Sequence, residues 1–158
     1  AIMLYLFIYL FMNLAAFYMA IFASNKLNAH HIDDWNGLGY KNPILSAFMV
    51  LTLISLTGLP PTSGFVGKFY IFAELFKHQQ FYWLAVVAIL NSVVSLYYYF
   101  KIVKSMYLDD VVGTIDKIDA HPVINWSIII FSAQNILFFL YWEPLIEFIE
   151  KSINLWIS

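Results

Sequence analysis

A run of helix-breaking residues interrupts the most apolar region of the chain. The run combines two adjacent prolines with three glycines: Gly58, Pro60, Pro61, Gly64 and Gly67. Proline has no backbone N–H, and the second proline also disfavours helical geometry at the residue before it. Glycine permits unusual backbone dihedrals and close approach of two backbones. Because freed backbone groups find no water in the core of a bilayer, a break at membrane depth must place them against other protein groups or a hydrated cavity.

The composition indicates that this break lies in a membrane protein. Hydrophobic residues make up 62% of the 158 residues and charged residues 11%, whereas a soluble domain has roughly 45–50% apolar and about 25% charged residues. The chain has no cysteine, which excludes disulfides, thiolate metal sites and iron–sulfur ligation by its own side chains. It also has no arginine and no basic run suited to nucleic acid.

Hydrophobicity predicts an all-α integral membrane chain with four transmembrane helices. The predicted spans cover 1–23, 43–78, 81–104 and 122–142. Polar loops are expected at 24–42 and 105–121, and the amphipathic tail at 143–158 is expected to lie along the membrane surface. We expect no signal peptide, because the first residues form an apolar run without a basic region or cleavage site. We expect instead one part of a larger polytopic fold.

The distribution of lysines predicts the orientation of these spans. Leaving out Lys68, which lies within the second span, more lysines lie on the side of the two long loops than on the other side. They are Lys26, Lys41, Lys101, Lys104 and Lys117 against Lys77 and Lys151. The positive-inside rule therefore places the long loops in the cytoplasm or the mitochondrial matrix.

The second span is too long for one continuous helix. A helix over 43–76 would measure about 51 Å, whereas the hydrocarbon core is about 30 Å thick. A broken helix that crosses once and a two-helix hairpin both resolve this. The second half alone, 64–76, would be about 20 Å long, which is too short to span. We therefore favour a single discontinuous crossing, with Asn42 as N-cap, Pro43 as first residue and Glu74 paired with Lys77 or His78 at the exit.

Lys68 is the strongest candidate for a residue with a chemical role. It begins the second half of the broken span, far from either end of the apolar block. A lysine in a low-dielectric site can exchange a proton near neutral pH, and such residues form proton relays in pumps. The break beside it would add free carbonyls and room for water. The alternative is a lysine that extends to the surface or pairs with a carboxylate on a neighbouring helix.

Other polar residues within the spans have more ordinary interpretations. Amide side chains are expected to hydrogen-bond between helices: Asn13, Gln134 and Asn135. A secondary polar path through Asn13, Ser95 and Lys101 is also possible. Small residues at helical spacing predict close helix packing along one stripe: Ala85, Ala88, Ser92 and Ser95. The run from His30 to Asp34 matches no metal-ligand spacing, so we interpret it as a solvated surface loop.

The segment SLTGLPPTSGFVGKFY, residues 55–70, resembles the signature of the antiporter-like membrane subunits of respiratory complex I, NADH:quinone oxidoreductase. The runs YYYFK at 97–101 and YLFM at 9–12 resemble the same family. The M-type subunit carries a glutamate where Lys68 stands, and the L-type subunit differs around the two prolines. Lysine together with the PPT sequence therefore favours the N-type subunit, which is subunit 2 in mitochondria.

The resemblance implies a fold, a role and a setting. The N-type subunit has fourteen helices with two inverted repeats, and this chain would supply helices 11 to 14. Its discontinuous helix 12 would carry Lys68 as a proton-relay residue. The implied partners are the other membrane-arm subunits and the lipid bilayer, without nucleic acid, in a bacterial plasma membrane or mitochondrial inner membrane. FMN, the iron–sulfur clusters and quinone belong to other subunits of that family's complex, so no cofactor and no redox chemistry are expected in this chain.

Two alternative functions remain open on the sequence. The chain could belong to a multisubunit cation/proton antiporter, which has the same fold. It could also be a structural membrane scaffold in which Lys68 only forms a pair. Upstream sequence with a further intramembrane lysine and a preceding Glu/Lys pair would favour the complex I reading.

Overall fold

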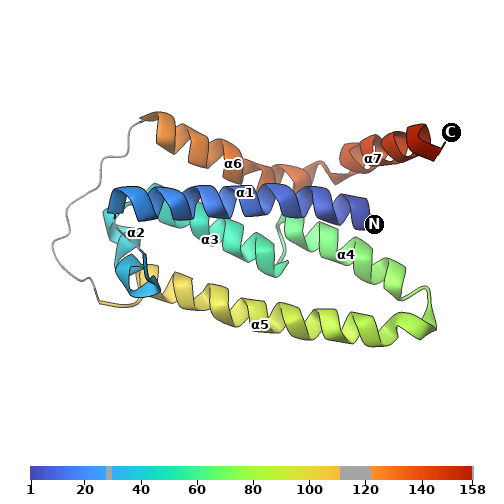
Figure 1. Cartoon of the computed structure of the whole chain (residues 1–158), viewed down its shortest axis with the longest axis horizontal. Helices are drawn as coiled ribbons and strands as arrows, with labels where there is room; N and C mark the ends of the chain where they lie inside the picture. Colours follow the sequence, from blue (N-terminus) through green and yellow to red (C-terminus); the bar gives the residue numbers. More distant parts are fainter. Residues whose placement is uncertain (28–29, 111–121, 158) are drawn as a thin grey trace.

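The computed structural model describes residues 1–27, 30–110 and 122–157, and all regular structure in these ranges is helical (Figure 1). The elements follow in the order α1 (Ile2–Leu27), η1 (Ile32–Trp35), α2 (Leu38–Lys41), α3 (Pro43–Thr57), α4 (Ser63–Leu75), η2 (Gln79–Phe81), α5 (Tyr82–Tyr107), α6 (Pro122–Leu140) and α7 (Trp142–Ile157). The long helices run roughly parallel or antiparallel to one another, as in a membrane bundle. The helices α3 and α4 follow each other along one flank of α1 (Figure 1).

Three helices of the described residues are long and apolar enough to cross a membrane. These segments are Ile2–Lys26, Gln79–Tyr107 and Pro122–Leu140. The helices α3 and α4 contain 15 and 13 residues, so each measures only about 20–23 Å. An integral membrane helical fold is therefore supported, but the fourth crossing predicted over 43–78 depends on α3 and α4 acting together.

The interruption between α3 and α4 has a local cause. Gly58 adopts a left-handed conformation with φ +84°. Its N–H donates to the carbonyl of Ser55, and the N–H of Leu59 donates to that of Ile54, at 3.0 and 3.3 Å. This pattern is a Schellman motif, which ends a helix because glycine tolerates the left-handed conformation. The Pro60–Pro61 peptide that follows is cis.

Gly64 and Gly67 lie inside α4, beyond the interruption. A Cβ atom added to Gly64 would lie 1.7 Å from the carbonyl oxygen of Ser55 on α3. One added to Gly67 would lie 3.3 Å from the ring of Tyr5 on α1. We expected these glycines to contribute to the break, but in the structure they allow α4 to pack closely against α3 and α1.

The segment 24–42, predicted as a polar loop, contains more regular structure than expected, whereas residues 30–34 are exposed, as predicted for a solvated surface loop. α1 continues to Leu27, and η1 and α2 follow at 32–35 and 38–41. Trp35 and Leu38 are buried. The segment is not a loop throughout, because these apolar side chains pack into the core cluster of the bundle. Of the second predicted loop, 105–121, the first residues belong to α5, which ends at Tyr107, and 111–121 lie outside the described residues.

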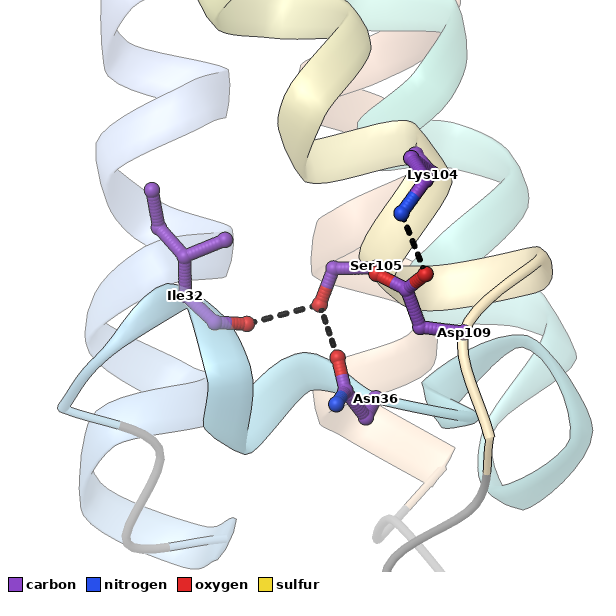
Figure 2. Close-up of polar contacts among 5 residues, drawn as sticks. All are labelled: Ile32, Asn36, Lys104, Ser105 and Asp109. Atoms are coloured by element: carbon purple, nitrogen blue, oxygen red, sulfur yellow. Dashed lines mark hydrogen bonds and ion pairs between the residues drawn. The ribbon is translucent and has the colours of Figure 1, made fainter.

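The hydroxyl group of Ser105 on α5 contacts the segment that contains η1, as Figure 2 shows. Its oxygen lies 2.7 Å from the carbonyl oxygen of Ile32 and 2.6 Å from Oδ1 of Asn36. The neighbouring Lys104 forms an ion pair with Asp109 at 2.5 Å. A side chain of α5 therefore holds η1 against the end of the bundle.

The interior of the bundle contains several polar side chains beside its apolar core, and the outer faces of the bundle are apolar. Fully buried side chains include small hydroxyl residues and one amide: Ser46, Thr52, Ser55, Ser63, Ser132 and Asn135. Apolar side chains along α1, α5 and α6 are exposed on the outer faces. Buried small polar residues beside an apolar core are typical of helices that pack closely in lipid. The tail helix α7 places Leu145, Ile146 and Ile149 against the first half of α1.

Three side-chain amides were predicted to form hydrogen bonds between helices, and one of them does so. Asn135 on α6 donates from Nδ2 to Thr52 Oγ1 on α3 at 3.4 Å, as predicted. Asn13 instead donates to the Tyr9 carbonyl of its own helix at 2.8 Å. Gln134 is buried, and its amide makes no hydrogen bond within the described residues. The two failures have one cause: spacing identifies the polar residue but not the group that faces it.

Candidate functional site

Lys68 lies in the second turn of α4, and its side chain turns back to the end of α3. The ammonium nitrogen Nζ donates to the carbonyl oxygens of Leu56 and Thr57 at 3.2 and 2.7 Å. It also lies 3.1 Å from Oγ of Ser92 on α5. Lys68 is half-buried at this junction of α3, α4 and α5. One side chain thereby joins three helices at the break.

The two carbonyl groups that Lys68 contacts are free because α3 stops there. The last four carbonyls of a helix have no partner within it. Those of Ile54 and Ser55 accept N–H groups from the Schellman turn, and those of Leu56 and Thr57 accept from Lys68. The C-terminus of a helix also carries partial negative charge. The broken helix thus offers a lysine both the hydrogen-bond acceptors and the electrostatic field that favour its binding.

Gly58 makes room for the lysine stem. A Cβ atom at this position would lie 2.6 Å from Cδ of Lys68. The glycine therefore serves the site twice: its positive φ ends α3, and its missing side chain lets Lys68 reach the freed carbonyls.

The start of α4 is held on α3 by Ser55. The buried hydroxyl of Ser55 accepts from the N–H of Gly64 at 3.1 Å and lies 3.3 Å from Oγ of Ser63. It also contacts Sδ of Met12 on α1 at 3.0 Å. The N–H groups in the first turn of a helix need partners outside it. Ser55 supplies one, and so fixes the α4 register that brings Lys68 to the break.

Two cavities meet at Lys68. One has a volume of about 290 Å³ and is lined mainly by apolar residues, including Phe65, Phe69 and Val93. The other has a volume of about 360 Å³, and its lining is more polar: Tyr5, Tyr9, Asn91, Ser92, Ser95 and Tyr99 line it together with Lys68 and apolar residues. A polar cavity of this size is large enough to hold water molecules. The lysine therefore stands between an apolar recess and a hydrophilic one.

The predicted secondary path is only partly assembled here. Ser95 lines the polar cavity, and its hydroxyl donates to the carbonyl of Asn91 at 2.9 Å. Asn13 and Lys101 do not line this cavity; Lys101 is exposed, and Asn13 bonds within α1. The pathway through these three residues stays a prediction.

Sequence reasoning missed the tyrosines of the polar cavity. Tyr5 and Tyr9 are four residues apart on α1 and so share a face, and their rings stack with a centroid distance of 5.6 Å. Their spacing could have identified this face, but a phenol in a transmembrane helix also fits an interfacial position. Ser92 was assigned only to the packing stripe, because nothing in sequence links it to a lysine 24 positions earlier.

The ion pairs in the part of the chain that the structure describes do not include Lys68. The salt bridges found there join Lys77 to Glu74 at 2.7 Å, as predicted, and Lys104 to Asp109. Lys68 contacts carbonyl and hydroxyl oxygens instead of a carboxylate. Within the described ranges, no cluster of three or more histidine or acidic side chains could hold a metal ion.

The fold and the site together define a helical membrane protein with a lysine bound at the end of an interrupted helix. Residues 1–95 match the family model described as NADH:quinone oxidoreductase/Mrp antiporter, TM. Because this match covers more than half of the chain, the chain belongs to that family.

Sequence similarity to known proteins covers between 80% and 98% of this chain in three relatives. NADH-quinone oxidoreductase subunit N 2 of Chloroherpeton thalassium is 40% identical over 157 residues, which cover 98% of this chain and 31% of that relative. Subunit N of Chlorobium chlorochromatii is 37% identical over 163 residues, with the same coverage of 98% and 31%. NAD(P)H-quinone oxidoreductase subunit 2 of Prochlorococcus marinus subsp. pastoris is 41% identical over 126 residues, which cover 80% of this chain and 25% of that relative. The chain thus spans at most about 31% of these relatives.

Proposed function

We propose that this chain is the part of an N-type subunit, helices 11 to 14 of fourteen, that carries a proton-relay lysine in the membrane arm of NADH:quinone oxidoreductase. The observation that carries the proposal is the position of Lys68, bonded to two carbonyls freed by the end of α3 and facing a polar cavity. The family match and the names of the relatives support the same assignment.

In this proposal α3 and α4 form one discontinuous crossing, which gives the chain four spans. Their combined length suits a bilayer better than two separate crossings, because each helix alone is shorter than the hydrocarbon core. Lys68 then lies near the middle of the crossing, where a charge is costly and is kept for function. The break supplies oxygen acceptors at the depth where lipid supplies none.

The residues at the break can bind and orient a proton carrier. The carbonyls of Leu56 and Thr57 hold Nζ of Lys68 in place, and the polar cavity gives that nitrogen a hydrophilic route on one side. A proton released by Lys68 leaves through this cavity, and the next proton returns to the same nitrogen. In this proposal, no redox step involves the residues of this chain, and the electron-transfer cofactors belong to other subunits of the complex. The partners of the chain are the other subunits of the membrane arm.

The decisive experiment replaces Lys68 in the full-length subunit within the assembled complex. Lys68→Met keeps a flexible stem and removes the ammonium group, so we expect NADH-driven proton pumping to fall severalfold in vesicles. Lys77→Met is the matched control, because Lys77 is exposed and pairs with Glu74 away from the cavity. Normal pumping by fully assembled Lys68→Met complex would refute the proposal.

The family description also includes the Mrp antiporters, which makes a cation/proton antiporter subunit the second candidate. Sodium-dependent exchange in vesicles without NADH would favour this candidate. A structural scaffold is the third reading. Under it, Lys68→Met would lower the amount of assembled complex and leave pumping per complex unchanged.

A further inference from the structure

The hydrogen bonds of Lys68 distinguish one of its three partners from the other two. An ammonium group has three N–H donors, and Nζ has three oxygen neighbours: Leu56 O, Thr57 O and Ser92 Oγ. Backbone carbonyls can only accept hydrogen bonds, whereas a serine hydroxyl both donates and accepts. Ser92 alone can therefore change its role when the lysine changes its charge.

The hydroxyl of Ser92 already has a second partner that suits this change. Its Oγ lies 3.0 Å from the carbonyl oxygen of Ala88, one turn earlier in α5, and donates to it. With its hydrogen directed to Ala88, the hydroxyl turns a lone pair toward Nζ of Lys68 at 3.1 Å. This is the arrangement that a protonated lysine requires.

A neutral lysine requires the opposite arrangement. An amine has two N–H groups and one lone pair, so it can serve the two carbonyls and still needs a donor. Rotation of the Ser92 hydroxyl from Ala88 O to Nζ supplies that donor, and it moves one hydrogen without breaking a covalent bond. In helices, Ser and Thr hydroxyls commonly bond to the carbonyl four residues earlier, and here that carbonyl provides the alternative partner.

We propose that Ser92 is a positioning residue that keeps Nζ of Lys68 hydrogen-bonded at the break in both of its charge states. It touches the relay lysine and lines both cavities that meet there. The feature of Ser92 that serves this role is its side-chain hydroxyl group, which contacts both Nζ of Lys68 and the carbonyl oxygen of Ala88. This inference rests on the proposed relay role of Lys68.

The test compares two variants of nearly equal shape in the assembled complex. Ser92→Thr keeps a hydroxyl, and Thr in a helix can place it on the carbonyl four residues earlier. Ser92→Val replaces that hydroxyl with a methyl group. Ser127→Val on α6 is the control, because the Ser127 hydroxyl donates to Val123 O at 2.8 Å, four residues earlier, and lies away from Lys68. Ser92→Ala is the second variant, for the case in which valine prevents assembly.

We expect Ser92→Thr and Ser127→Val to pump at close to the normal rate per assembled complex. Ser92→Val and Ser92→Ala should pump about three- to tenfold more slowly, the effect of losing one hydrogen bond of ordinary strength. Equal rates for the Thr and Val variants, or normal pumping by both Val and Ala variants, would overturn the role of Ser92. If Lys68→Met also pumps normally, the proposed function fails together with this inference; if Lys68→Met is defective, only the inference fails.

Discussion

Nζ of Lys68 lies 2.7 Å from the carbonyl oxygen of Thr57, the last residue of α3. A side chain from the second turn of α4 thus caps the end of α3. This contact explains why the break and the charge occur together. The break provides acceptors that a continuous helix would have used internally, and the lysine satisfies carbonyls that lipid would leave without partners.

Gly58→Ala should disturb both sides of this contact. Alanine in the left-handed conformation costs about 1–2 kcal/mol, and its Cβ would lie 2.6 Å from Cδ of Lys68. We therefore expect a lower thermal stability of the subunit in the purified complex and slower pumping. Leu59, the next residue, is exposed, so Leu59→Ala is the control and should change the free energy of unfolding by less than about 0.5 kcal/mol. Equal melting temperatures for the two variants would contradict the assigned role of Gly58.

Gly64→Ala should be far more damaging than Gly67→Ala, although both glycines lie in α4. The Gly64 Cβ would overlap the backbone oxygen of Ser55 at 1.7 Å, whereas the atom nearest to a Gly67 Cβ, in the ring of Tyr5, lies 3.3 Å away. Overpacking typically costs about 1–3 kcal/mol, and backbone overlap lies at or above the upper end. Native gels that report the amount of assembled complex check the order. Assembly of both variants at wild-type levels would show that α4 can move away from α3.

Ser105→Ala should release η1 from the end of α5. The change removes the hydroxyl that contacts Ile32 O and Asn36 Oδ1 (Figure 2), at a cost of about 0.5–1.5 kcal/mol, the net contribution of a typical hydrogen bond. Hydrogen exchange in the segment 32–37 should become faster, while α3 keeps its protection. Ser127→Ala, which loses only a bond within its own helix, is the control. Unchanged exchange in 32–37 would mean that the packing of Trp35 and the backbone hydrogen bond from Gly37 N–H to Ser105 O hold the segment without the hydroxyl.

Acidification should loosen the turn that precedes η1. The Asp34 carboxylate accepts the N–H of His31 at 2.7 Å and that of His30 at 2.9 Å, and these bonds hold the pKa of Asp34 below its ordinary value of 3.8. A lowered pKa adds stability above the unfolded value, and this stability is lost as pH falls through the folded value. Protection of the His30 and His31 amides, corrected for intrinsic exchange, should therefore be constant at neutral pH and decrease below about pH 4.

Asp34→Asn provides the comparison for this pH dependence. Asparagine keeps one acceptor oxygen but has no carboxyl group to titrate. Its protection should be weaker at neutral pH and should not change across the acidic range. An identical acid response in the two proteins would assign the effect to another group.

The sequence determined where the helix that begins at Pro43 is interrupted and which residue beyond the interruption carries charge. A glycine and two prolines end a helix through their own covalent structure, so Gly58, Pro60 and Pro61 act without help from distant residues. The Glu74–Lys77 pair was predictable for the same reason, since three positions in a helix place two side chains together.

Only the tertiary structure decided what Lys68 touches. Ser92 lies 24 positions later, and α5 brings it to the lysine by helix packing that no local pattern encodes. The same limit explains why Asn13 bonds within its own helix while Asn135 reaches Thr52 on another. Covalent geometry and short spacings are local properties of a sequence, whereas the partner of a polar side chain depends on which helices meet and at which register.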